Sequence, residues 1–129
     1  MMPSRADCLR AAYESAQDRL PPGAGLPAFE RSLAAWEVIP VQVDGQLVGA
    51  ILRSGPELHA CVRPQGFGRW LGRRHLRLVQ DAIDRHGCCT TSVMAGNRTG
   101  MEFVSRLGFV RTGEQGGVIF YRKGGNHGY

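Results

Sequence analysis

The sequence predicts a mixed α/β fold with one main sheet, in the order helix, helix, three strands, helix, strand, helix and two strands. Two observations predict this class. Apolar residues recur at helical spacing in several segments, and they alternate at period two on both sides of Asp44-Gly45. The chain of 129 residues is long enough for one domain with a buried core. We therefore expect a single domain over residues 1–123 and a flexible tail over 124–129.

Capping residues and chain breakers delimit the predicted helices. Ser4 and Asp7 have the spacing of a capping box at the start of the first helix. Proline and glycine residues over 21–27 end that helix, and Gly87 takes the place of a C-terminal glycine after the third. The predicted helices are 4–20, 28–35, 69–86 and 97–107.

Period-two alternation and turn residues delimit the predicted strands. Asp-Gly is a strong signal for a two-residue hairpin turn, so Asp44-Gly45 joins the first two strands. A Ser-Gly-Pro turn over 54–56 then leads into the third strand. The predicted strands are 38–43, 46–52, 57–62, 88–94, 109–112 and 118–122.

Charge and composition bound the function classes. Lysine and arginine number 16 against 11 aspartate and glutamate, and the resulting net charge of +5 favours a phosphate-bearing partner, either a nucleotide cofactor or a nucleic acid. No apolar run approaches the roughly 18 residues that span a membrane. The N-terminal segment lacks the apolar core of a secretory signal, so we expect a cytoplasmic protein without a membrane partner.

The four cysteines follow no metal-ligand spacing. Cys88 and Cys89 are adjacent, so they would point to opposite faces of a strand. We expect reduced thiols and no metal site, the four thiols being those of Cys8, Cys61, Cys88 and Cys89.

The stretch 62–76 has the pattern of an anion site. A strand ends at Val62, a glycine turn follows, and a helix then begins, an arrangement that aims backbone N–H groups at an anion. Arg69, Arg73 and Arg74 stand near the helix start, where each exposed cation costs roughly 0.3–1 kcal/mol against the helix dipole. A bound anion would offset this cost. A solvated basic helix start is the alternative interpretation.

Residues 7–122 resemble the GNAT superfamily of acyl-CoA-dependent N-acyltransferases. The hairpin V-Q-V-D-G-Q-L-V-G-A-I is similar to the second and third strands of that family. The segment N-R-T-G-M-E-F-V-S-R-L-G-F carries the most specific match, at Asn97, Gly100, Phe103, Leu107, Gly108 and Phe109. The resemblance implies a mixed, mostly antiparallel sheet flanked by helices, splayed between strands 58–62 and 88–94, with acetyl-CoA bound in the opening.

The family's pyrophosphate loop reads Arg/Gln-x-x-Gly-x-Gly/Ala, and this chain departs from it. In one register Gly72 matches, but Phe67 and Trp70 replace the basic residue and the middle glycine. In a second register Gln65 and Gly68 match, and Trp70 takes the last position. The indole either turns outward or blocks the phosphate. The implied cofactor-binding residues are Cys61, Val62, Phe67, Gly68, Arg69, Trp70, Gly72, Arg73, Arg74 and Asn97.

Candidate catalytic residues follow from the chemistry of amine acylation. Glu57 and His59 share one face of the third strand, and either would serve as a general base; exposed strand residues are the alternative interpretation. The tyrosine that often protonates the leaving thiolate in the family falls on Val104 here. The thiolate would then leave with help from water, from a backbone dipole, or from another residue such as Tyr121 or Tyr13. We also expect Asn97 to cap the helix that follows it.

The resemblance implies transfer of an acetyl group from acetyl-CoA to a primary amine of a small molecule or protein, by direct attack, with a homodimer as the expected assembly. Phe67, Trp70 and Val104 favour an alternative, a catalytically inactive GNAT-like binding or structural module similar to arginine-rich copies encoded by bacteriophages. Nucleic-acid association is a third hypothesis. It rests on generic electrostatics alone, because no recognition module accompanies the arginines.

Overall fold

A computed structural model describes residues 3–16, 25–62 and 73–124 of the chain. The end of the first predicted helix, the glycine turn with the start of the third, and the C-terminal tail from residue 125 lie outside the described residues. The same holds for five of the predicted cofactor-binding residues, namely Phe67, Gly68, Arg69, Trp70 and Gly72.

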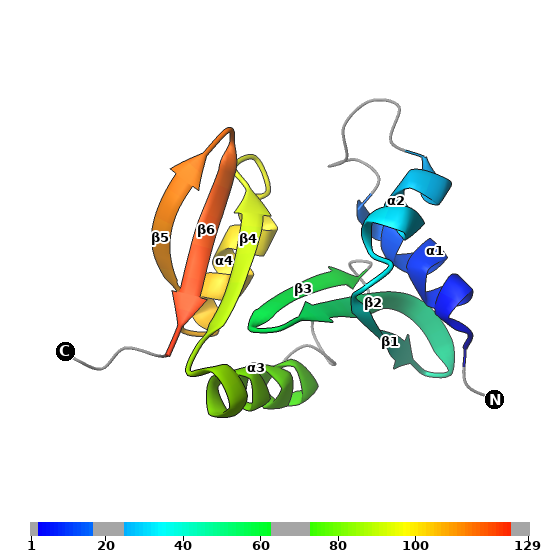
Figure 1. Cartoon of the computed structure of the whole chain (residues 1–129), viewed down its shortest axis with the longest axis horizontal. Helices are drawn as coiled ribbons and strands as arrows, with labels where there is room; N and C mark the ends of the chain where they lie inside the picture. The colour runs from blue at the N-terminus through cyan, green and yellow to red at the C-terminus, as the bar shows by residue number, and fades with distance from the viewer. Residues whose placement is uncertain (1–2, 17–24, 63–72, 125–129) are drawn as a thin grey trace. The chain divides into compact units, whose positions relative to one another are not determined.

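Within the described residues, six strands form one sheet in the order β1-β2-β3-β4-β6-β5 (Figure 1). The neighbouring pairs β1–β2, β4–β6 and β5–β6 are antiparallel, and β3–β4 is parallel. The predicted mixed, mostly antiparallel sheet is therefore confirmed. The strands are β1 (Glu37–Val43), β2 (Gln46–Ser54), β3 (Glu57–Val62), β4 (Cys89–Met94), β5 (Val110–Gln115) and β6 (Val118–Lys123).

The four helices of the described segments are α1 (Arg5–Ala16), α2 (Leu26–Ser32), α3 (Arg73–His86) and α4 (Arg98–Arg106). Two cap predictions are confirmed. The Asp7 backbone N–H donates to Ser4 Oγ over 3.1 Å and the Ser4 N–H donates to Asp7 Oδ2 over 3.3 Å, so a capping box starts α1. Gly87 ends α3 with φ of 86° and donates its N–H to the Ile83 carbonyl.

Several element boundaries differ from the prediction by a few residues, and two of these differences have a clear structural reason. Helix α2 begins at Leu26 and includes Pro27, which was expected in the preceding loop. Proline lacks an N–H, and the first turn of a helix is where that donor is not needed. Strand β5 continues past Thr112 to Gln115, because a register shift between Arg111 and Gly113 accommodates the extra residue.

The chain divides into two compact units. The first contains residues 1–54 and 59–75, and the second contains residues 55–58 and 76–129. The core of the first unit lies where α1 and α2 pack on β1 and β2. It includes two buried clusters, Cys8 with Ala12 and Ala50, and Leu9 with Leu33 and Leu52. Partly buried side chains that pack on both clusters are Phe29, Val38 and Cys61.

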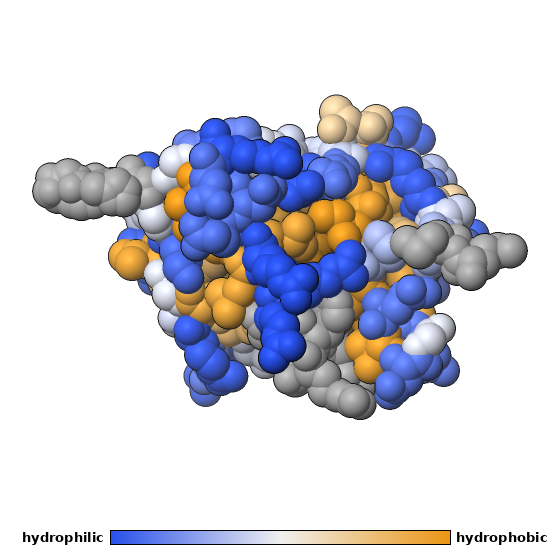
Figure 2. Space-filling view, turned by 90° about the horizontal axis from the view of Figure 1, so that it is seen from below, coloured by the Kyte–Doolittle hydropathy of each residue, from blue (hydrophilic) through white to orange (hydrophobic). Residues whose placement is uncertain are grey.

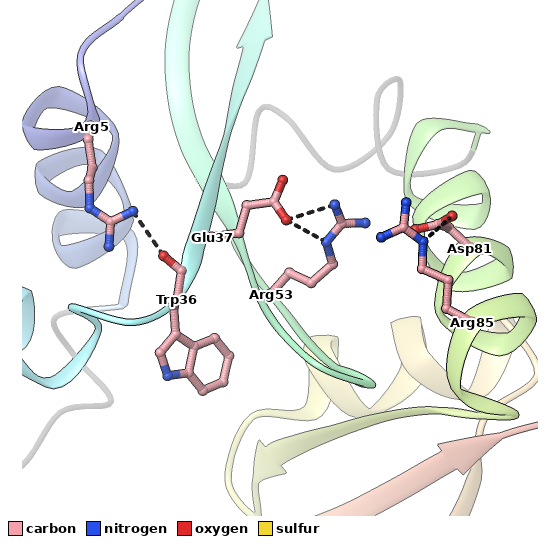
Figure 3. A network of polar contacts seen from close by, with 6 residues as sticks. All are labelled: Arg5, Trp36, Glu37, Arg53, Asp81 and Arg85. Carbon is pink, nitrogen blue, oxygen red and sulfur yellow. Dashed lines mark hydrogen bonds and ion pairs between the residues drawn. The ribbon is translucent and has the colours of Figure 1, made fainter.

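Arg5 of α1 forms two hydrogen bonds to backbone carbonyl groups that follow α2 (Figure 3). Its guanidinium donates to the Leu33 carbonyl over 2.7 Å and to the Trp36 carbonyl over 2.9 Å. These contacts join the start of α1 to the turn that follows α2. Next along the chain, Glu37 of β1 forms an ion pair of 2.7 Å with Arg53 of β2.

In the second unit, α4 lies behind β4 and β6 in the view of Figure 1. Val93 and Ile119 pair across β4 and β6, and both are buried; a Cβ on Gly100 of α4 would lie 3.1 Å from Val93 Cγ1, so Val93 packs against α4. Lys123 donates from Nζ to the Leu107 carbonyl over 2.7 Å, so a cation satisfies the C-terminal end of α4. Asp81 and Arg85 form an i, i+4 ion pair of 3.2 Å on α3 (Figure 3).

The expected splay requires β3 and β4 to pair at their closed end. Among the described residues, these strands pair at a single position, where Glu57 lies opposite Thr90. The Thr90 N–H also donates to the Pro56 carbonyl over 2.9 Å. All three residues belong to the second unit.

Candidate functional site

Strand β3 carries both candidate bases. Because β3 runs without interruption, Glu57, His59 and Cys61 alternate onto one of its faces, while Leu58 and Val62 are buried on the other. Glu57 and His59 are half-buried, neither fully exposed nor enclosed. Glu57 belongs to the second unit and His59 to the first.

His59 lies against Trp36. The centroids of the two rings are 5.7 Å apart and the rings are tilted by 42°. Trp36 is itself half-buried, because its indole packs on the cluster of Leu9, Leu33 and Leu52. This packing residue therefore has a candidate base as one of its neighbours.

The end of β3 is tightly supported from β2. A Cβ atom on Gly49 would lie 2.1 Å from the Cys61 carbonyl oxygen and 2.6 Å from the Val62 Cα, so no side chain fits there. Cys61 and Val62 are the first two residues predicted to hold the cofactor. Gly49 was not among the sequence candidates. Its signal was a glycine in the interior of an apolar strand, which commonly marks a close backbone approach.

The first turn of α3 carries positive charge only. Arg73 and Arg74 are exposed there, and the turn contains no acidic residue. The helix dipole disfavours cations at this end, so the turn suits an anion that contacts the arginines. The face in Figure 2, seen from the side where Figure 1 draws α3, is largely hydrophilic with hydrophobic side chains between. The first unit contains the candidate base His59. It also contains four of the residues predicted to bind the cofactor, Cys61, Val62, Arg73 and Arg74.

Asn97 caps α4 as predicted. Its Oδ1 accepts the Gly100 N–H over 3.1 Å. Gly100 must be small, because a Cβ there would lie 2.6 Å from Asn97 Nδ2 and 3.1 Å from Val93 Cγ1. The family-like spacing of Asn97 and Gly100 thus has a structural reason. A role of Asn97 toward the cofactor stays a prediction.

Tyr121 and Val104 are both buried in the second unit, with exposed fractions of 5% and 7%. Tyr121 lies on β6 between Thr91 of β4 and Arg111 of β5, and it shares a face of the strand with Ile119, two residues away. Its role as a proton donor stays a prediction. Helix α4 presents the apolar Val104 at the position where the family often has tyrosine.

Burial shifts the pKa of three titratable groups toward the uncharged form. It lowers the pKa of His75, on the inner side of α3, to about 4. Burial, with the neighbouring Cys88, raises the pKa of the Cys89 thiol to about 11. Burial and then Asp7 raise the pKa of the Cys8 thiol. Cys8, Cys61, Cys88 and Cys89 form no disulfide.

Neither a metal site nor a membrane span is found in the described parts of the chain. There, no three side chains of His, Cys, Asp or Glu are grouped to hold a metal ion. No described helix is long and apolar enough to cross a membrane.

Comparison with known proteins identifies the fold. No family model and no curated protein matches the sequence. Among solved structures, an acetyltransferase from Thermus thermophilus is 18% identical, with a TM-score of 0.69 over 96% of this chain and 93% of that one. A ribosomal-protein-alanine N-acetyltransferase from Brucella melitensis is 19% identical, with a TM-score of 0.64 over 94% and 96%.

A third similar structure, of yncA from Salmonella typhimurium, was solved with its cofactor acetyl-CoA. It is 18% identical to this chain, with a TM-score of 0.60 over 100% of this chain and 94% of that one. At such identities the likeness establishes architecture rather than activity. The chain has the fold of the GNAT N-acetyltransferases, as its sequence motifs predicted.

Proposed function

We propose that this protein is an N-acetyltransferase that transfers an acetyl group from acetyl-CoA to a primary amine by direct attack. The observation that carries the proposal is the fold, shared over nearly the whole chain with acetyltransferases. A second observation supports it. The strand that carries the candidate base leads to a helix whose first turn has two exposed arginines and no acidic residue.

The described residues fit the cofactor at its anionic end. Arg73 and Arg74 would bind its phosphates, because guanidinium groups pair well with phosphate oxygens. The backbone of Cys61 and Val62 would hold its pantetheine arm, together with the predicted residues of the glycine turn. When bound, acetyl-CoA supplies the activated thioester.

The protein's own residues would move two protons. An imidazole nitrogen of His59, or the Glu57 carboxylate, would take the proton from the attacking amine, because only a neutral amine is nucleophilic. The Tyr121 hydroxyl would donate the proton that the leaving sulfur needs. Positioning of the two reactants supplies much of the remaining acceleration.

The test is acetyl transfer to a panel of primary amines and N-terminal peptides, measured by mass spectrometry of the products. We expect the variant Arg73→Ala, Arg74→Ala to raise the KM for acetyl-CoA by about 10-fold or more. Arg106→Ala is the matched control, since Arg106 is an exposed arginine in the last turn of α4. If none of the acceptors in the panel is acetylated, the proposal is contradicted.

A catalytically inactive GNAT-like binding module is the second candidate. The buried Val104 favours it, because α4 offers no tyrosine hydroxyl at that position. The variant Trp70→Gly separates the two candidates. If acetyl-CoA binds only after this substitution, the natural protein does not use the cofactor and the module is the better description.

A further inference from the structure

We propose that Trp36 is a positioning residue that fixes the orientation of the His59 imidazole for the transfer reaction. The inference rests on the proposed function, in which His59 takes the proton of the attacking amine. In that step the amine nitrogen bonds to the acetyl carbon, its proton passes to an imidazole nitrogen, and the carbon–sulfur bond breaks with its electron pair left on sulfur.

Trp36 is held from two sides, so its position is well defined. Its indole packs on Leu9 of α1, Leu33 after α2 and Leu52 of β2. Its carbonyl oxygen accepts a hydrogen bond of 2.9 Å from Arg5, whose guanidinium also binds the Leu33 carbonyl (Figure 3). The side chain is therefore packed against α1, β2 and the turn after α2 within the first unit.

Because the indole has a defined position, its contact with His59 restricts the orientation of the imidazole ring. At 5.7 Å and a tilt of 42°, the two rings have the spacing of a favourable aromatic pair. The two side-chain torsions of a histidine have several minima, and packing against a fixed ring selects among them. A general base must lie within hydrogen-bond reach of its proton, and a displacement of about 1 Å reduces the rate strongly.

The first unit contains a matched control for this contact. Phe29 packs on the same cluster as Trp36, and its ring pairs with Tyr13 at 5.5 Å rather than with His59. Phe29→Leu therefore removes an aromatic ring from the same core. Trp36→Leu removes the ring that contacts His59, and Trp36→Phe keeps an aromatic ring at that position.

The first measurement is independent of activity. The His59 ring signals are assigned in ¹H–¹³C spectra of the full chain by their loss in His59→Gln. We expect Trp36→Leu to shift these signals by removing the indole ring current, Trp36→Phe to shift them less, and Phe29→Leu to leave them in place. Unmoved His59 signals in Trp36→Leu would overturn the inference.

The second measurement divides the effect between kcat and KM. We expect Trp36→Leu to lower kcat about 10-fold, the order of one aromatic pair contact, with the Kd for acetyl-CoA unchanged. Trp36→Phe is expected to recover most of kcat, and Phe29→Leu to retain it; melting curves identify any variant that fails to fold. Moved His59 signals with an unchanged kcat would overturn the positioning role alone. A wild-type protein that transfers no acetyl group would overturn the proposed function, whatever the spectra show.

Discussion

Gly49→Ala tests the close approach between β2 and β3. The added Cβ would lie 2.1 Å from the Cys61 carbonyl oxygen, whereas a tolerable carbon–oxygen contact is about 3.3 Å. The strands must then separate by about 1 Å at this point, because both neighbours are backbone atoms that cannot rotate away. Overpacking of this kind costs about 1–3 kcal/mol, and each weakened ladder hydrogen bond adds about 1 kcal/mol. We expect the free energy of unfolding to fall by about 3 kcal/mol.

Urea unfolding monitored by circular dichroism measures this loss. Gly113→Ala is the matched control. Gly113 also lies in a strand, yet a Cβ there meets no heavy atom within 4 Å. We expect the control to unfold close to the wild-type midpoint. A Gly49→Ala loss below about 1 kcal/mol, or one equal to that of the control, would refute the steric argument.

Two further predictions concern the polar side chains of His75 and Asn97. The folded pKa of His75 is about 4 against 6.5 when unfolded, so the unfolded chain binds the extra proton between these values and stability falls as pH drops through that window. The loss in the free energy of unfolding reaches about 3 kcal/mol. In unfolding curves compared at pH 7.5 and pH 4.5, His75→Gln should lack this loss. An equal pH dependence of stability in the wild type and in His75→Gln would contradict the assignment of the loss to His75. Asn97→Ala should destabilise the protein by about 1 kcal/mol in urea titrations, whereas Asn97→Asp should retain the cap of α4; equal losses in both would show that the side-chain oxygen is not the stabilising group.

Local signals made much of the fold predictable. The Asp44-Gly45 hairpin, the bounds of β3, the end of α3 at His86 and the cap at Asn97 are each specified by a few adjacent residues. The resemblance to the family also predicted a mixed, mostly antiparallel sheet, because the order of the motifs along the chain restricts the possible topologies.

Long-range contacts were not predictable in the same way. Arg5 binds carbonyl groups 28 and 31 residues away, and no local pattern in the sequence indicates a contact at that separation. The pairing of Trp36 with His59 and the approach of Gly49 to Cys61 likewise depend on how strands and helices pack. The start of α2 was misplaced because Pro27 acts as a breaker inside a helix and as a favourable residue in its first turn.

The roles of individual site residues stay predictions. His59, Cys61, Val62, Arg73 and Arg74 belong to the first unit, whereas Glu57, Asn97 and Tyr121 belong to the second. The catalytic roles of Glu57 and Tyr121, a homodimer and a cytoplasmic location rest on the sequence and its resemblance.

Calorimetric titration of the 129-residue chain with acetyl-CoA tests the central claim most directly. We predict saturable binding of one cofactor per chain, clearly below about 1 mM, that is weakened by Arg73→Ala, Arg74→Ala and unchanged by Arg106→Ala. No heat of binding at millimolar acetyl-CoA, or equal binding by both arginine variants, would contradict it.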